Sequence, residues 1–545
     1  MFDVKKLAGL ILLMVFAGCT KAGTGNETGG KVHNAFTHPH YLRYADGGGD
    51  LATLNPVINS EVRLNWLTDM TMAYLVRYDH DNRPVPELVT VVPTQANGGI
   101  SKDGKTITWH IRRGVKWSDG APFDADDVVF STKVVQNPAN NVIGRDGWDL
   151  ITRIDEPDRF TVVYHLSKPY SSYLPTFFGT GGANPCVLPK HLLGNLPNIN
   201  QAPYNSKPVG IGPFRVVRWK RGDSIDMEAN PYYWRGQPKL KRVTYKLIPD
   251  RNTLLTQLQT GEVDLWPLVG TGYIDRTKQI QSYQTDVVPS YAFRHVDFNL
   301  KNPILQDLRV RQALRFGLDR KMILEKSAHG YGILQETMVS PTNPYFDKDV
   351  PLTPFDPAKA KQLLDQAGWR VGLDGVRVKN GQRLAFDFAS YTGTPDTDQQ
   401  IELIRASWKE IGVQINLRKY AVNVFFANPA GIVYGGKFDI TIYSWGGDPN
   451  ADLSNLYQCN QAPPSGQNMM HYCNKVADAA MVKAKQSYDP RTRAEYVDTV
   501  QEQVIEDVPT VVLYVLKDGF AYNRDLIGFT PNQVSAFDDI MNVDI

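Results

Sequence analysis

The chain has 545 residues, yet beyond its N-terminal segment nothing approaches the run of about 18 apolar residues that indicates a membrane-spanning helix. A single hydrophobic core stops growing at about 250–300 residues, so the chain is long enough for two or three water-soluble domains. Strand and helix patterns alternate irregularly, with many Pro and Gly interruptions and no internal repeat. We therefore expect several domains that contain both helices and strands.

Residues 1–18 are typical of a secretory signal peptide. Two lysines precede the uncharged segment Leu7–Ala17, which is too short to span a bilayer. Phe16-Ala-Gly-Cys19 is similar to the lipobox of bacterial lipoproteins, although Phe16 stands where Leu is usual. Cys19 is then lipidated, and residues 19–36, rich in Gly, Thr and Lys, form a flexible tether. A soluble secreted protein that is cleaved elsewhere is the alternative.

The segment GISKDGKT (99–106) satisfies the phosphate-loop pattern G-x-x-x-x-G-K-[ST]. An ATP site would require a helix that begins at Lys105-Thr106. Instead, Ile107, Trp109 and Ile111 alternate with polar residues, as in a half-buried strand. Asp103-Gly104 is then the two-residue turn of a hairpin. Because an exported protein also meets no ATP pool, we exclude ATP binding.

The formal net charge of +2 gives no reason to expect a nucleic-acid partner. Aromatic residues make up 11% of the chain, including 26 Tyr and 10 Trp. This share suits a protein that holds its ligands by stacking and apolar contact.

Besides Cys19 the chain has three cysteines, Cys186, Cys459 and Cys473. An oxidising compartment favours pairing. Cys459 and Cys473 are 14 residues apart across a polar loop, so we predict a disulfide between them and leave Cys186 single and buried. A metal site is the rival interpretation, but no second pair of Cys or His lies nearby.

Two helices can be predicted from local signals. Asp124 is expected to cap a helix with Asp127 at its third position, and turn and capping roles explain the local carboxylates better than a calcium or acid–base site does. From Asp398 to Gly412, the residues Ile401, Ile404, Trp408 and Ile411 form one apolar helix face. Gly412 ends that helix, and 412–417 then alternates as a strand.

Seven segments, in this order, resemble the oligopeptide/dipeptide-binding family of ABC transporter solute receptors, and together they span essentially the whole mature chain. They are LRYADGGGDLATLNP (42–56), WHIRRGVKWSDGAPFDADDVVFS (109–131), PVGIGPFRVVRWKRGDSIDMEANPYYWRGQP (208–238), LQTGEVDLWP (258–267), FNLKNPILQDLRVRQALRFGLDR (298–320), FDPAKAKQLLDQAGW (355–369) and SWGGDPNADLSNLYQC (444–459). One departure is Ile211, where the family usually has Thr.

The resemblance implies an α/β fold, a two-lobed clamshell of the periplasmic-binding-protein type (type II-like) with an extra α+β domain on the first lobe. Two strands would cross the hinge, near 291–299 and 510–517. The expected parts are the signal peptide (1–18), the lipidated Cys and tether (19–36), lobe I (37–53, 204–289 and 516–545), the extra domain (54–203) and lobe II (290–515).

The resemblance also indicates candidate ligand-binding residues. Asp448 occupies the position that pairs with the ligand's α-ammonium in peptide-binding members; capping the turn at Pro449 is the alternative. Trp445 would flank the ligand or belong to the core. Asn59-Ser60-Glu61 matches, in position only, a segment that contacts the ligand backbone. Tyr391 stands where dipeptide-specific relatives have an Arg for the ligand carboxylate, which points away from strict dipeptide binding.

The function implied is capture of a peptide or other small solute for ABC permease subunits with cytoplasmic ATPases, by a monomer anchored through its lipid on the outer side of a bacterial membrane. An oligosaccharide or metal-chelate receptor, a sensor or chaperone of the same fold, and a secreted hydrolase are the alternatives. No cofactor, catalytic residue or metal site is expected. His38 and His40 are two residues apart and are expected to be solvated.

Replacing Cys19 with Ser should release the protein from membranes, because a lipidated thiol is the only anchor that the sequence offers. Fractionation of cells that express either form measures this. Unchanged membrane association of Cys19→Ser would contradict the assignment.

Overall fold

The computed structural model describes residues 34–545 except 60, 80–82, 143, 181–184, 393–394, 428–429, 448–449, 533–536 and 538, together with the side chain of Val62. The expected signal peptide, Cys19 and most of the tether lie outside the described residues. Within the described ranges, no helix is both long enough and apolar enough to cross a membrane.

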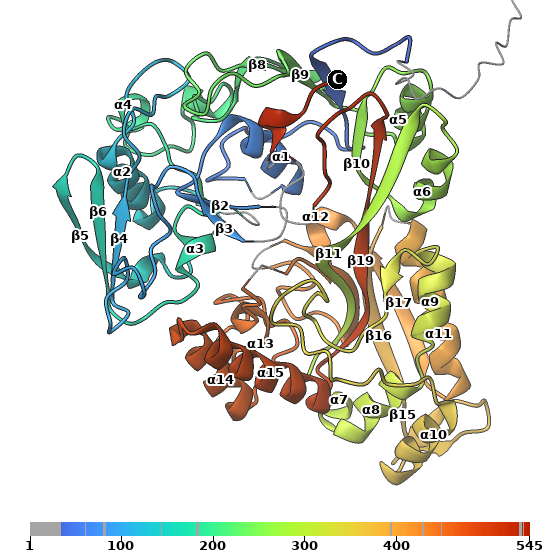
Figure 1. Ribbon diagram of the computed structural model, residues 1–545. Coiled ribbons are helices and arrows are strands. Elements are labelled where there is room, and N and C mark those ends of the chain that lie inside the picture. The colour runs from blue at the N-terminus through green and yellow to red at the C-terminus, as the bar shows by residue number, and fades with distance from the viewer. Residues whose placement is uncertain are drawn as a thin grey trace, which may run out of the picture.

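Two long strands join the two lobes of the molecule (Figure 1). β11 (Tyr283–Phe298) and β19 (Thr510–Asn523) pair in antiparallel fashion from Tyr283–Asn523 to Asp297–Thr510. They confirm the two crossing strands that were expected near 291–299 and 510–517. One sheet therefore runs through both lobes. Its order is β17 (Gln414–Tyr420), β16 (Ala385–Tyr391), β18 (Ile440–Trp445), β11, β19, β10 (Leu265–Val269), β1 (Tyr41–Tyr44), β9 (Arg242–Lys246), β8 (Ser224–Ala229) and β7 (Phe214–Lys220), with β12 (Gly332–Ile333) paired to β19.

In lobe II, helices cover both faces of the β16–β18 end of this sheet. One face packs against α8 (Leu308–Phe316), α9 (Arg320–Ser327), α10 (Pro357–Gln366) and α11 (Pro395–Glu410). The other face packs against α12 (Val422–Phe425) at β16 and β18, and against α14 (Lys475–Gln486) and α15 (Pro490–Asp507) at β11 and β19. Shorter elements of this lobe are α7 (Pro303–Gln306), α12 (Val422–Phe425), α13 (Ser454–Tyr457) and the small sheet of β13 (Arg370–Val371), β14 (Arg377–Lys379) and β15 (Gln382–Arg383).

Lobe I contains strands β1 and β7–β10, with α1 (Val62–Thr71), α5 (Arg251–Gln259) and α6 (Thr271–Lys278). A separate hydrophobic core, drawn entirely from residues between Val57 and Ile211, lies beside it, and we call this part the extra domain (Figure 1). Its elements are β2 (Val76–Tyr78), β3 (Pro84–Pro86), β4 (Thr106–His110), α2 (Ala125–Gln136), β5 (Ile151–Asp158), β6 (Thr161–Leu166), α3 (Tyr173–Thr176) and α4 (Lys190–Leu193).

The segment with the phosphate-loop pattern is a turn that leads into a strand, as predicted. β4 follows directly from Thr106, and no helix begins there. The turn is longer than the two residues expected, because Ser101 N donates to Thr106 O (3.0 Å) and leaves four residues between them. The Ser101 hydroxyl stabilises this longer turn by accepting from Thr106 N (2.9 Å). Gly104 adopts φ +68°, a conformation that suits glycine.

The two predicted helices are also confirmed. α2 begins after Asp124, and Asp124 with Asp127 forms a capping box, an arrangement that stabilises a helix by about 1 kcal/mol. α11 buries Ile401, Ile404 and Trp408, and its chain reverses at Gly412 with φ +84°. The helix begins at Pro395, three residues before the predicted start, and β17 runs on to Tyr420.

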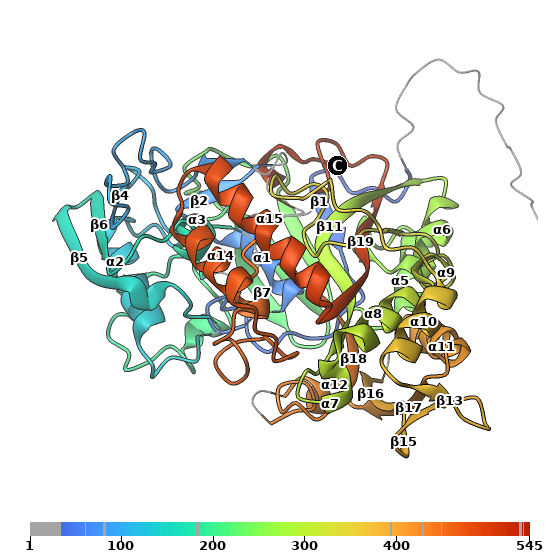
Figure 2. The same cartoon turned by 90° about the horizontal axis from the view of Figure 1, so that it is seen from below.

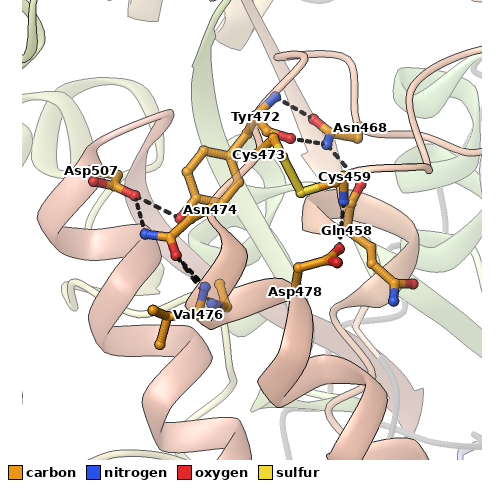
Figure 3. The surroundings of a disulfide bond; sticks show 10 residues. Gln458, Cys459, Asn468, Tyr472, Cys473, Asn474, Val476, Asp478 and Asp507 are labelled. Atoms are coloured by element: carbon orange, nitrogen blue, oxygen red, sulfur yellow. Dashed lines mark hydrogen bonds between the residues drawn. A yellow bond between two sulfur atoms is a disulfide. The ribbon is translucent and has the colours of Figure 1, made fainter.

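Cys459 and Cys473 form a disulfide that closes a loop just before α14 (Figure 3). Asn468 stabilises this loop, since its amide donates to the carbonyl oxygens of Gln458 (3.0 Å) and Tyr472 (2.7 Å). Asn474 then caps α14 by accepting from Val476 N (2.8 Å). The disulfide therefore holds the N-terminal end of α14 in place. Cys186 is single and fully buried, and burial raises the pKa of its thiol to about 12.

Replacing both Cys459 and Cys473 with Ala should lower the free energy of unfolding by about 2–4 kcal/mol. The disulfide closes a loop between residues 14 positions apart, and this loop reduces the conformational entropy of the unfolded chain. Urea unfolding of the oxidised wild type and the double variant measures the difference. The wild type reduced with a thiol serves as the control and should match the variant. Equal midpoints for all three samples would show that the disulfide contributes nothing.

Candidate functional site

A cavity of about 320 Å³ lies between the extra domain and lobe II, beside the strands that join the lobes. β11 contributes Tyr291 and Phe293 to its wall. The extra domain contributes Asp146, Trp148, Tyr170, Ser172, Pro175 and Thr176, with Gly144 and Pro185. Lobe II contributes Met338, Val339, Ser340, Asn343, Trp445–Gly447, Asn450–Leu453, Asn455 and Leu456. The volume lies within the range of small-molecule binding sites in proteins.

The segment expected to bind the ligand forms part of this wall. Trp445 is the last residue of β18, half-buried, and it lines the cavity together with Gly446 and Gly447. Gly447 N donates to Tyr291 O (3.2 Å), so the end of β18 is held against β11. Asp448 follows immediately but lies outside the described residues. Its two described neighbours, Gly447 and Asn450, both line the cavity.

Tyr391 ends β16 and is not among the lining residues. Its hydroxyl accepts from Arg294 Nη1 (3.1 Å), and its ring contacts Phe425 and Phe426. Burial alone would raise the pKa of Tyr391, but the positive charge of Arg294 outweighs it and holds the pKa below its usual value. A buried arginine from β11 thus stands beside the position where the sequence offered no basic residue.

Arg294 also connects several elements at the base of lobe II. Its guanidinium donates to Gln400 Oε1 (2.8 Å) and Thr397 Oγ1 (2.8 Å) of α11, and to Ser444 Oγ (3.4 Å) of β18. Sequence reasoning missed this residue, because 97 positions separate it from Tyr391 and no local pattern marks it.

The first-lobe candidates have local structural roles. Asn59 Nδ2 donates to Thr53 O (3.2 Å) and to Glu61 Oε1 (3.2 Å), and Glu61 forms an ion pair with Arg63. Ser60 lies outside the described residues. Asn59 and Glu61 precede α1 and do not line the cavity. His40 pairs with Asp544 (2.8 Å), and no cluster of metal-ligating side chains occurs among the residues that the structure describes.

Helices α14 and α15 lie beside the extra domain, near α3 (Figure 2), and contact it through hydrogen bonds. Ser171 N donates to Lys485 O (2.6 Å), and Ser171 Oγ donates to Ala484 O (2.8 Å) while accepting from Arg493 Nη1 (2.5 Å). The Tyr488 hydroxyl lies 3.0 Å from the carbonyl oxygen of Gly104 and 3.1 Å from that of Tyr170. These contacts bring the two walls of the cavity together, so the structure shows the lobes closed.

A lysine bridges the two carboxylates of the cavity wall. Lys485 Nζ lies 3.0 Å from Asp146 of the extra domain and 3.4 Å from Asp452 of lobe II. Burial would lower the pKa of Lys485, but the two carboxylates outweigh it and raise the pKa. Burial likewise opposes ionisation of Asp452, yet Lys485 and hydrogen bonds from Ser454 lower its pKa. Lys485 and Asp452 are therefore both charged at neutral pH.

This geometry, two lobes joined by a pair of strands with a cavity where they meet, defines a solute-binding protein of the clamshell type. The family model described as bacterial extracellular solute-binding proteins, family 5 (middle part), matches residues 84–467. The chain belongs to this family, as the sequence resemblance indicated. The family's members are substrate-binding proteins of transporters and work outside the cytoplasm.

Among its relatives, the chain is 28% identical to the oligopeptide-binding protein AppA of Bacillus subtilis (strain 168) over 490 residues, which cover 88% of this chain and 87% of AppA. The structure of AppA from Bacillus subtilis in complex with a nonapeptide aligns with a TM-score of 0.78 at 25% identity, over 92% of this chain and 98% of AppA. NikZ from Campylobacter jejuni in complex with Ni(L-His) aligns with a TM-score of 0.79 at 26% identity, over 93% of this chain and 99% of NikZ.

The hinge contains one carboxyl group with an unusual proton affinity. Asp518 of β19 lies opposite Val288 of β11, and burial raises its pKa to about 6. The usual value in an unfolded chain is about 3.9. The folded protein therefore binds this proton more tightly between about pH 4 and pH 6, and the contribution of Asp518 to stability falls as the pH rises through that window.

Replacing Asp518 with Asn should stabilise the folded protein by about 1–2 kcal/mol at pH 8, where the wild type carries a partly buried carboxylate, and by much less at pH 4.5. Urea unfolding at both pH values measures the difference. Glu495→Gln, on the exposed face of α15, is the control and should show no such pH dependence. A gain that is equal at both pH values would rule out the raised pKa.

Proposed function

We propose that this protein is the extracytoplasmic substrate-binding lipoprotein of an ABC importer, which captures a peptide-like solute between its lobes and delivers it to the permease subunits. The observation that carries the proposal is the cavity at the hinge, whose walls come from both sides of the closed molecule. The nonapeptide bound to the related AppA supports a peptide as ligand. Lipidation at Cys19, a monomeric state and coupling to cytoplasmic ATPases belong to the same proposal.

The domain boundaries expected from the sequence are also proposed, with one change. Their support is that the core clusters separate into residues of lobe I, the extra domain and lobe II. Leu64, Leu67 and Met70 of α1, however, pack in the core of lobe I. We therefore propose that α1 belongs to lobe I, and that the extra domain consists of the segment around Val57 together with the residues from about 72 on.

We propose Asp448 as the residue that binds the α-ammonium group of the peptide. Two features support this role: both described neighbours line the cavity, and Trp445 is placed to flank a ligand there. A carboxylate in a closed cleft is costly without a cation and favourable with one. Asn59, Ser60, Glu61 and Tyr391 have weaker support, since the three that are described do not line the cavity.

Replacing Asp448 with Asn should weaken the binding of a free peptide by roughly 30-fold to several thousand-fold, since the lost charge-assisted hydrogen bond is worth about 2–5 kcal/mol. The same peptide with an acetylated N-terminus should bind the wild type poorly and respond little to the change. Isothermal titration calorimetry of both peptides on both proteins measures this.

Asp349→Asn, an exposed carboxylate of lobe II outside the cavity wall, is the matched control and should leave both affinities unchanged. Equal affinities for free and acetylated peptides would remove the ammonium contact. Failure of every peptide to bind would remove the peptide proposal and favour a carbohydrate or metal chelate as the solute.

A further inference from the structure

The cavity wall is rich in aromatic and aliphatic side chains. Trp148 comes from a short 3-10 helix, Tyr170 from the loop before α3, Trp445 from β18, and Tyr291 and Phe293 from β11. Met338, Val339, Leu453 and Leu456 complete the apolar part. Such a surface gains free energy when it covers an apolar group of a ligand and removes it from water.

The charges of the described wall are internally balanced. Among the described residues that line the cavity, Asp146 and Asp452 carry acidic side chains, and none is Glu, Lys, Arg or His. Lys485 pairs with both, and Arg493 adds a second positive charge that lowers the pKa of Asp452. Two carboxylates thus face two cations. The cluster carries no net charge for a ligand to neutralise.

This balance depends on closure of the lobes. Asp146 belongs to the extra domain, whereas Asp452, Lys485 and Arg493 belong to lobe II. The side chains of Lys485 and Asp452 are 19% and 16% exposed in the closed molecule, so this pair is largely removed from water, whereas Asp146 is 76% exposed. A charged ligand side chain that met this cluster would lose hydration, whereas the four charged groups described there are already paired with one another.

We propose that the cavity selects an uncharged apolar or aromatic group of the ligand, and that Lys485 is the residue that sets this specificity by neutralising Asp146 and Asp452. The inference rests on the proposed function, since it concerns the same cleft. The preference for one kind of ligand side chain is then set by Lys485, whose ammonium group pairs with two residues of the cavity wall and not with the ligand. Removing that ammonium group gives the described cluster a net negative charge, and the cavity then favours a cation.

The test compares tetra-alanine peptides that carry Phe, Lys or Glu at each position in turn, measured by calorimetry on the full-length mature protein. In the wild type, the best Phe peptide should bind at least about tenfold more tightly than the matching Lys peptide. Lys485→Met keeps most of the aliphatic stem, and it should lower this Phe-to-Lys affinity ratio by about tenfold or more. Lys483→Met, on the exposed face of the same helix, is the matched control and should leave the ratio unchanged.

A second substitution should restore the preference. Asp452→Asn retains an oxygen that can accept from Ser454 N (3.0 Å), and in the double variant Lys485→Met/Asp452→Asn it brings the net charge of the described cluster back to zero. The ratio should then return to within about threefold of the wild type. If Lys485→Met does not fold, Asp146→Asn tests the opposite sign, because it leaves an excess positive charge and should improve the binding of Glu peptides.

The Phe-to-Lys affinity ratio distinguishes a role of Lys485 in ligand specificity from a role in holding the lobes closed. If Lys485 only held the lobes together, Lys485→Met would weaken Phe and Lys peptides equally, and that outcome would overturn the proposal. If no peptide binds, thermal shifts with 4-phenylbutanamide and 6-aminohexanamide provide the comparison. A preference for the neutral aromatic amide that reverses in Lys485→Met would support the specificity while the peptide proposal fails; no preference would overturn the specificity as well.

Discussion

The antiparallel pairing of β11 with β19 is the interaction on which the arrangement of the molecule depends. The sheets of both lobes attach to these two strands, β10 at one end and β18 at the other. In lobe II, β11 is held by buried polar contacts, since Asp297 accepts from Tyr443 (2.6 Å) and pairs with His295 (2.8 Å). The register breaks between Pro289 and Phe293, where fewer ladder bonds resist bending. Tyr291, in the cavity wall, lies within this break, so bending of the hinge and the shape of the cavity are physically connected.

Closure of the molecule uses short polar contacts and one ion cluster. Ser171, Tyr488 and Arg493 bond largely to backbone or to small hydroxyl groups. Water replaces these hydrogen bonds when the lobes separate. Lys485 is different, because it gains a second carboxylate only when the extra domain approaches. Since an ion pair that forms on closure also loses water, its net contribution is small. The closed state is therefore accessible without being locked.

The sequence predicts those parts of the fold that local chemistry determines. The alternation of Ile107 and Trp109 excludes a phosphate loop, and the apolar face of α11 can be read from spacing alone. The family resemblance supplies the clamshell, because order along the chain is itself a specific signal. What local patterns cannot supply are contacts between distant positions: Arg294 with Tyr391, and Lys485 with Asp146, which is 339 residues away. The first pair is set by how strands of one lobe meet and the second by how two domains meet, and local sequence patterns do not record either.

One small feature of the extra domain links its surface to the lifetime of a bound solute. At Gly104, an added Cβ would come within 2.6 Å of the Tyr488 ring and 3.1 Å of Pro169. The absence of a side chain there thus determines how near α15 can approach the turn after Ser101. Any larger residue would hold the lobes slightly apart and leave a path for water into the cavity. Residence time, and with it the interval available for meeting a permease, would then be governed by a turn that never touches the solute.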